Sequence, residues 1–219
     1  MKRIIIFASG SGTNAENLIK FFHNREHVSV IQVLTNNPHA KVLDRAKKLK
    51  VSALSFNRIA FTKTNDVLNI LKASNPDLIV LAGFLWKFPE NILKHYPNKV
   101  INIHPALLPK YGGKGMYGEN VHKAVIKAKE KESGITIHYV NEHYDEGNII
   151  AQGTPQDILS NKQVRSVYLL LKPMSRLQQL LVLPKRCQHL NSQWHACFIN
   201  QSRNVNGGQP HQRPNSVEN

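Results

Sequence analysis

Strand-type and helix-type segments alternate along the chain from Arg3 to Gln152, and this alternation restricts the possible folds more than any other feature. Short runs rich in Ile, Val and Leu recur, and segments whose apolar residues have helical spacing separate them. The run Asp77–Ala82 is almost entirely apolar, as expected for a strand covered on both faces. Strands joined through helices pair in parallel with right-handed crossovers. The sequence therefore predicts an α/β fold, with a doubly wound, mostly parallel sheet and helices on both faces.

The spacing of apolar residues sets the expected bounds of each element. Strands are predicted at Arg3–Ala8, Val28–Thr35, Ala53–Phe56, Asp77–Ala82, Val100–His104, Gly134–Val140 and Asn148–Gln152. Helices are predicted at Asn14–His23, Ala40–Lys50, Thr62–Ala73, Pro89–Tyr96 and Val121–Lys131, with a cap for the third at Thr64 or Asn65.

A change of composition near Thr154 predicts a domain boundary. After Asp157 the only acidic residue is Glu218, while Gln, Asn, Ser and His become frequent. Apolar residues within 163–183 have helical spacing, but periodicity is lost from Gln188 onward. We expect one folded domain at residues 1–153 and a divergent tail at residues 154–219, of the kind that a frameshift produces and in part disordered.

The formal net charge of +15 raises the question of nucleic-acid binding. The basic residues lie on helix-type segments and in the tail, and no RNA-binding aromatic pattern or zinc-ligand spacing accompanies them. We therefore expect solvated basic surfaces, which could also attract phosphorylated substrates, and no nucleic-acid partner.

Targeting and redox features are few. No apolar run approaches the ~18 residues of a membrane-spanning helix, and the run after Met1-Lys-Arg is too short for a signal peptide, so no membrane association is expected. Cys187 and Cys197 lie late in the chain, form no metal-ligand pattern and are expected to be reduced thiols. These features predict a cytoplasmic protein, and the sequence leaves its oligomeric state open.

Asn102 and His104 are the first candidates for chemistry. They lie one residue apart at the end of the run 99–104, so period-2 geometry places both on one face of a strand, which Pro105 ends. Ligands of open α/β sheets bind beyond the carboxyl ends of the strands. Asn102 and His104 are therefore either catalytic or the polar cap of a strand that runs into a loop.

The Gly-rich segment Ser9–Ala15 lies between the first strand and the first helix. Gly10 and Gly12 allow backbone angles that expose successive amides, and the helix N-terminus after them attracts an anion. The segment also fits the dinucleotide fingerprint, but the acid expected at the end of the second strand is missing, since none occurs in 28–43. The segment is therefore interpreted either as a binding site for a phosphate group or as a structural turn.

Two further loops leave both a functional and a structural interpretation open. The segment Leu81–Pro89 offers Phe84, Trp86 and Phe88, which could accept an aromatic ring or pack in the core. In the acidic segment Val140–Gly147, Asp145 could meet His104 through tertiary contact, where it would favour the protonated ring and orient it, or it could belong to an ordinary turn.

These motifs together resemble the phosphoribosylglycinamide formyltransferases, folate-dependent enzymes of purine biosynthesis. The matching segments, in family order and spacing, are Ser9–Asn14, Leu81–Phe84, Ile101–Lys110 and His138–Gly147. The resemblance covers roughly residues 1–153, and the pattern Asn-x-His-Pro-x-Leu-Leu-Pro is specific to folate formyltransferases. It implies transfer of a formyl group from 10-formyltetrahydrofolate to the amine of glycinamide ribonucleotide, with no metal.

The resemblance also implies roles for individual residues. Asn102 would donate a hydrogen bond to the developing oxyanion, His104 would donate the proton, and Asp145 would orient His104 and raise its pKa. Substrate phosphate and ribose would lie on Gly12, Thr13 and Asn14. The folate pocket would be lined by Leu85, Trp86, Lys87, Phe88, Asn102, Asn141, Glu142, His143, Tyr144 and Asp145.

The sequence departs from the family at three places. The family often has Arg at the position of Trp86, and the basic folate contact near 61–64 is only loosely matched by Lys63. Nothing after Gly153 clearly matches, so we expect residues 154–219 not to form the family's C-terminal helix. A formyltetrahydrofolate hydrolase is one alternative, because related hydrolases share the core and the catalytic trio. An inactive phosphate- or folate-binding module is the other, because the C-terminus is altered. A tRNA formyltransferase is disfavoured because the tail is too short and irregular for its RNA-binding domain.

Overall fold

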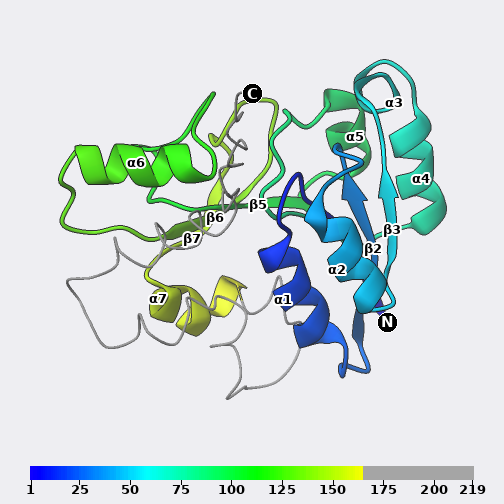
Figure 1. Cartoon of the computed structure of the whole chain (residues 1–219). Helices are drawn as coiled ribbons and strands as arrows, with labels where there is room; N and C mark the ends of the chain where they lie inside the picture. Colours follow the sequence, from blue (N-terminus) through cyan, green and yellow to red (C-terminus); the bar gives the residue numbers. More distant parts are fainter. Residues whose placement is uncertain (165–219) are drawn as a thin grey trace, which may run out of the picture. The chain divides into compact units, whose positions relative to one another are not determined.

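A seven-stranded sheet runs through residues 1–164, the part of the chain that the computed structural model describes (Figure 1). The strands occur in the spatial order β3-β2-β1-β4-β5-β6-β7. Their bounds are β1 Lys2–Phe7, β2 Val28–Thr35, β3 Ser52–Ser55, β4 Leu78–Leu81, β5 Val100–His104, β6 Ile135–Tyr139 and β7 Ile149–Gly153. Strands β1 to β5 pair in parallel, whereas β6 pairs antiparallel with β5 and with β7. The predicted fold class is confirmed.

Helices cover both faces of the sheet (Figure 1). Their bounds are α1 Thr13–Phe22, α2 Lys41–Lys48, α3 Arg58–Thr62, α4 Asp66–Ser74, α5 Glu90–His95, α6 Glu119–Lys127 and α7 Pro155–Ser160. Alternation along β1 divides the core: Ile4 and Ile6 pack with α1, α2 and α7, while Ile5 and Phe7 pack with α3, α4 and α5. Each face thus has its own apolar cluster, as expected for a doubly wound sheet.

The sequence analysis missed two short helices. Helix α3 begins after Asn57, whose side chain accepts a hydrogen bond from the Ala60 N–H at 2.8 Å, and the predicted helix at 62–73 begins only at Asp66. Helix α7 begins with a capping box between Thr154 and Asp157. Helices of five and six residues are too short to show an apolar period, so only their caps were available as signals.

The last described residues belong to the folded body. Ile158 on α7 is 2% exposed, and Val164 is buried as well. Both belong to the apolar cluster that also contains the buried residues of α1 and α2. The expected boundary at Gly153 and the divergent, partly disordered tail stay predictions. The expected helix within 163–183 and both cysteines fall almost wholly outside the described residues.

Candidate active site

Two loops that follow parallel strands are tied together at the carboxyl edge of the sheet. Ser9, after β1, donates its backbone N–H to the Gly83 carbonyl at 3.0 Å, and its hydroxyl accepts from the Leu85 N–H at 2.9 Å. Ser9 is buried. The Gly-rich segment and the aromatic loop after β4 therefore hold fixed positions relative to each other, beside the end of β5.

The structure brings Asn102, His104 and Asp145 together. Asn102 Nδ2 donates to Asp145 Oδ1 at 3.2 Å, and His104 Nδ1 lies 3.6 Å from the same oxygen. The other carboxylate oxygen of Asp145 accepts from the Gly113 N–H at 3.0 Å. Asp145 has a left-handed φ of 57°, which turns the loop after β6 back over β5. The contact between Asp145 and His104, left open by the sequence, is present.

His138 on β6 is a member of this cluster that the sequence analysis did not single out. It pairs with Asn102 across the antiparallel strands, is 2% exposed, and its Nε2 lies 3.1 Å from Asn102 Nδ2. Its Nδ1 lies 2.8 Å from the Tyr139 carbonyl, which can only accept, so Nδ1 carries the hydrogen and Nε2 accepts from Asn102. Only the β5–β6 register reveals this pairing, and no local motif encodes that register.

His104 differs from the expectation in its proton affinity. Burial lowers the pKa of His104 below that of a free imidazole, and His138 acts in the same direction. Asp145 and the Tyr111 carbonyl act to raise the pKa but do not outweigh burial. Asp145 thus raises the pKa of His104, as expected. The net shift of that pKa is nevertheless downward, because His104 is only 3% exposed. The ring is therefore neutral near pH 7.

The contact with the Tyr111 carbonyl shows which nitrogen of the neutral His104 ring carries the hydrogen. His104 Nε2 lies 2.7 Å from the Tyr111 carbonyl, so Nε2 carries the hydrogen and Nδ1 presents a lone pair toward Asp145. The segment around Tyr111 is anchored by Glu130, which accepts from the Tyr111 hydroxyl and from Lys110 Nζ, both at 2.8 Å.

Asp145 is ionised under the same conditions. Burial alone would raise the pKa of its carboxyl group, but His138 and His104, which carry positive charge when protonated at low pH, and the Gly113 N–H together hold the pKa below its usual value. The cluster therefore combines a fixed carboxylate, a neutral imidazole and an amide. Such a set can accept a proton, hold the resulting cation and donate to a developing negative charge.

The predicted phosphate loop forms the entry to α1. Gly12 has φ 71° and forms the N-cap of the helix, and a Cβ there would lie 2.3 Å from Val42 Cγ2, so the position requires glycine. Thr13 and Asn14 follow in the first turn with exposed side chains. The predicted substrate residues thus lie together at a helix N-terminus.

A cleft of about 300 Å³ includes four of the predicted folate residues, Trp86, Lys87, Phe88 and Glu142. It is lined by Arg58, Thr62, Trp86, Lys87, Phe88, Pro89, Glu90 and Glu142. The predicted residues Leu85, Asn102, Asn141, His143, Tyr144 and Asp145 are not part of this lining, and neither is Lys63. Two basic residues, Lys87 and Arg58, line the cleft, and the guanidinium of Arg58 lies 5.4 Å from the centre of the Trp86 ring.

Residues 1–164 contain neither a candidate metal site nor a candidate membrane-spanning helix. No group of three or more His, Cys, Asp or Glu side chains has the arrangement of a metal site in this range. No helix in the same range combines the length and apolar character needed to cross a membrane.

Comparisons with known proteins show which family this chain resembles. The formyl transferase family matches residues 2–173. A phosphoribosylglycinamide formyltransferase of Bacillus subtilis is 34% identical over 159 residues, which cover 69% of this chain and 78% of the relative. A chloroplastic phosphoribosylglycinamide formyltransferase of Arabidopsis thaliana is 32% identical over 73% of this chain, but this chain spans only 57% of that relative's length.

Solved structures show a comparable sequence identity to this chain. The crystal structure of a phosphoribosylglycinamide formyltransferase from Bacillus halodurans is 30% identical, with a TM-score of 0.61 over 82% of this chain and 93% of that chain. The fold similarity and the sequence match therefore point to the same family. The chain belongs to the formyl transferase family.

Proposed function

We propose that the chain transfers the formyl group of 10-formyltetrahydrofolate to the amine of 5'-phosphoribosylglycinamide, a step of purine (IMP) biosynthesis. Family membership and the relatives' names support the reaction class. The observation that carries the proposal is the convergence of Asn102, His104 and Asp145 within hydrogen-bonding or ion-pair distance at the carboxyl end of β5. The cytoplasmic location stays a prediction.

In this reaction the bound folate supplies an activated formyl carbon, to which the substrate amine forms a new C–N bond while the bond to the folate nitrogen breaks. Negative charge develops on the formyl oxygen, and Asn102 Nδ2 is the donor placed to meet it. Both hydrogens of that amide are engaged by Asp145 and His138 in this structure, so the formyl oxygen takes the place of one of these acceptors.

Proton transfer is assigned to His104. The attacking amine must lose a proton, and the folate nitrogen that leaves must gain one. Because burial lowers the pKa of His104, the ring is neutral at rest, and its unprotonated Nδ1 can accept the amine's proton. The resulting cation is stabilised by Asp145, 3.6 Å from Nδ1, before the proton is returned to the leaving nitrogen. Delivery from Nε2 requires the Tyr111 carbonyl to move away from the ring.

Substrate and folate are assigned to the two tied loops. The N–H groups at Gly12, Thr13 and Asn14 suit a phosphate group and the adjoining ribose. The cleft has an aromatic wall and one arginine, which suits a flat ring system that carries carboxylates. Folate contacts are proposed for Leu85, Trp86, Lys87, Phe88, Asn102, Asn141, Glu142, His143, Tyr144 and Asp145.

The test is product analysis with the purified full chain. Incubation with 10-formyltetrahydrofolate and glycinamide ribonucleotide should give formylglycinamide ribonucleotide and tetrahydrofolate in equal amounts. Formate released at the same rate without the ribonucleotide would instead support the hydrolase. Binding of both ligands without any product would support the inactive module.

A further inference from the structure

Helix α2 holds three successive residues of the loop that precedes α1. The Val42 N–H donates to the Gly10 carbonyl at 3.2 Å, and Arg45 Nε donates to the Ser11 carbonyl at 2.7 Å. Gly12 packs directly against the Val42 side chain and backbone. The conformation of the loop is therefore set by an element that takes no part in the cluster around His104.

These contacts leave the loop with an uneven distribution of polar groups. The carbonyl oxygens of Gly10, Ser11 and Gly12 each accept a hydrogen bond, the last from the Glu16 N–H at 2.8 Å. The backbone N–H groups of residues 11–14, by contrast, donate to no group within residues 1–164. Because the carbonyls are held away, the free N–H groups can face an anion together.

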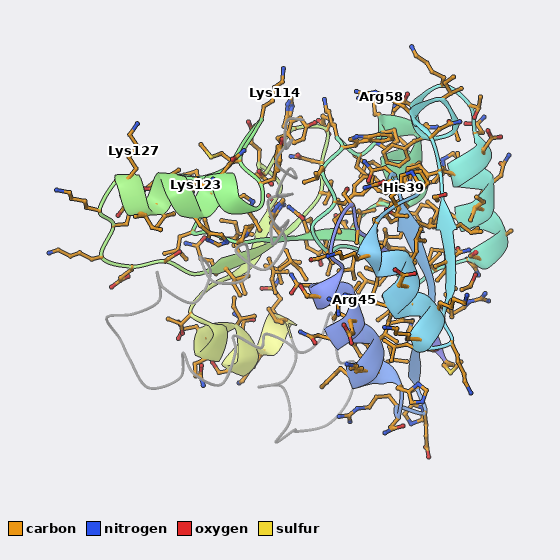
Figure 2. All side chains as sticks on the ribbon, in the orientation of Figure 1. His39, Arg45, Arg58, Lys114, Lys123 and Lys127 are labelled. Atoms are coloured by element: carbon orange, nitrogen blue, oxygen red, sulfur yellow. The ribbon has the colours of Figure 1, made fainter. Side chains whose placement is uncertain are left out.

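One residue in the first turn of α1 opposes anion binding. Glu16 would place a negative charge near the N-terminus that receives the substrate phosphate. Its carboxylate is bound by two cations, Lys20 Nζ at 2.5 Å and Arg45 Nη1, and is 20% exposed. Lys20 is 57% exposed and makes a single contact on the same helix, whereas Arg45 is 33% exposed and bridges Glu16 to the Ser11 carbonyl. Figure 2 shows Arg45 between α1 and α2.

We propose that Arg45 is a positioning residue for the substrate phosphate, acting through the loop rather than by contact with the substrate. It turns the Ser11 carbonyl away from the site and neutralises Glu16, and the planar guanidinium can do both because its N–H groups point in fixed directions. This role rests on the proposed function, because it assumes that glycinamide ribonucleotide binds at Gly12–Asn14.

The alternative is that Arg45 only joins α1 to α2 and supports the fold. A purely structural role would change the melting temperature and affect both substrates alike. A positioning role would act on the phosphorylated substrate alone, and it would depend on the charge of Glu16. The two roles therefore differ in a measurement that separates the KM values.

The experiment compares steady-state kinetics of the full chain with those of R45M, R45K, E16Q and the double variant E16Q/R45M. Lys47→Met is the matched control, since Lys47 is an exposed cation on the same helix. We expect R45M to raise the KM for glycinamide ribonucleotide about tenfold or more, with the KM for 10-formyltetrahydrofolate within about twofold. The double variant should recover part of this loss, R45K should be intermediate, and K47M should equal the parent chain.

Calorimetric titration with glycinamide ribonucleotide alone provides the second measurement, and thermal melting checks the fold of each variant. If R45M leaves the KM for the ribonucleotide unchanged, or changes both KM values and kcat in parallel, the positioning role is wrong while the proposed function stands. If R45M does not fold, R45K and E16Q/R45M test the positioning role instead, through the ratio of the KM for the ribonucleotide to the KM for 10-formyltetrahydrofolate. If the parent chain neither binds nor formylates the ribonucleotide, the proposed function itself fails.

Discussion

The Asn102 amide and the Asp145 carboxylate define the site at the scale of single residues. Asn102 gives its two hydrogens to His138 and Asp145, and Asp145 in turn accepts from Asn102 and Gly113. Each side chain thus fixes the orientation of the next, so the proposed donor for the formyl oxygen is oriented in the absence of substrate. Removing one member leaves the polar groups of the others without partners.

Asp145→Asn tests this arrangement directly. The variant keeps the shape of the side chain but removes the charge that stabilises protonated His104, so the pKa of His104 should fall further below its present lowered value. We expect kcat to drop about 100-fold or more, with little change in either KM. Glu146→Gln, a neighbouring exposed acid, is the control and should behave like the parent chain in the formyl-transfer assay.

Alanine substitutions at Gly12 and Gly10 should differ in their effect on the free energy of unfolding. Gly12→Ala would force an L-residue to φ 71° and place its Cβ 2.3 Å from Val42 Cγ2. The combined strain and overpacking should cost about 2–4 kcal/mol of unfolding free energy. A Cβ at Gly10 meets no atom within 4 Å, so Gly10→Ala should cost under about 1 kcal/mol. Equal losses in urea unfolding of the two variants would contradict this account.

At the scale of elements, strands were easier to predict than the contacts between them. β2 and β5 have the predicted bounds, and each end of the other strands differs by one residue, because apolar runs between turn residues are local signals. The pairing of β5 with β6, which places His138 beside Asn102, depends on tertiary register and could not be predicted. The contact from Asp145 to His104 was one of two interpretations that the residues left open, and the family resemblance favoured it.

The turn after β5 depends on a side chain of β6. Thr136, fully buried, donates its hydroxyl to the Ala106 carbonyl at 2.7 Å and accepts from the Leu108 N–H at 3.1 Å. Thr136→Val keeps the shape but leaves both backbone groups without a partner, which should cost about 2–4 kcal/mol of unfolding free energy.

Thr136→Ser retains the hydroxyl and is the matched comparison. It should lose less stability than Thr136→Val, because only a methyl group is removed. A serine variant as unstable as the valine variant in chemical denaturation would show that the hydroxyl does not hold this turn.

At the scale of the whole molecule, the buried histidine should make stability depend on pH. The pKa of His104 in the folded chain is lower than in the unfolded chain, so the unfolded chain binds more protons as pH falls through about 6.5. Stability is therefore highest above that pH and decreases below it. We expect a lower unfolding free energy at pH 5.5 than at pH 7.5.

Substitution of His104 isolates this contribution. In His104→Gln the difference in unfolding free energy between pH 7.5 and pH 5.5 should be smaller than in the parent chain. His143→Gln, at an exposed histidine, should retain the full difference. A pH dependence that survives unchanged in His104→Gln would place its origin elsewhere in the molecule.

The central claim is that this chain catalyses formyl transfer through the cluster at the end of β5. The most direct test is kcat/KM of the purified full chain and of His104→Ala, with 10-formyltetrahydrofolate and glycinamide ribonucleotide, followed by folate absorbance. The account predicts turnover by the parent chain and a loss of about 100-fold or more in the variant. Equal rates for the two proteins, or no formyl transfer by the parent chain, would contradict it.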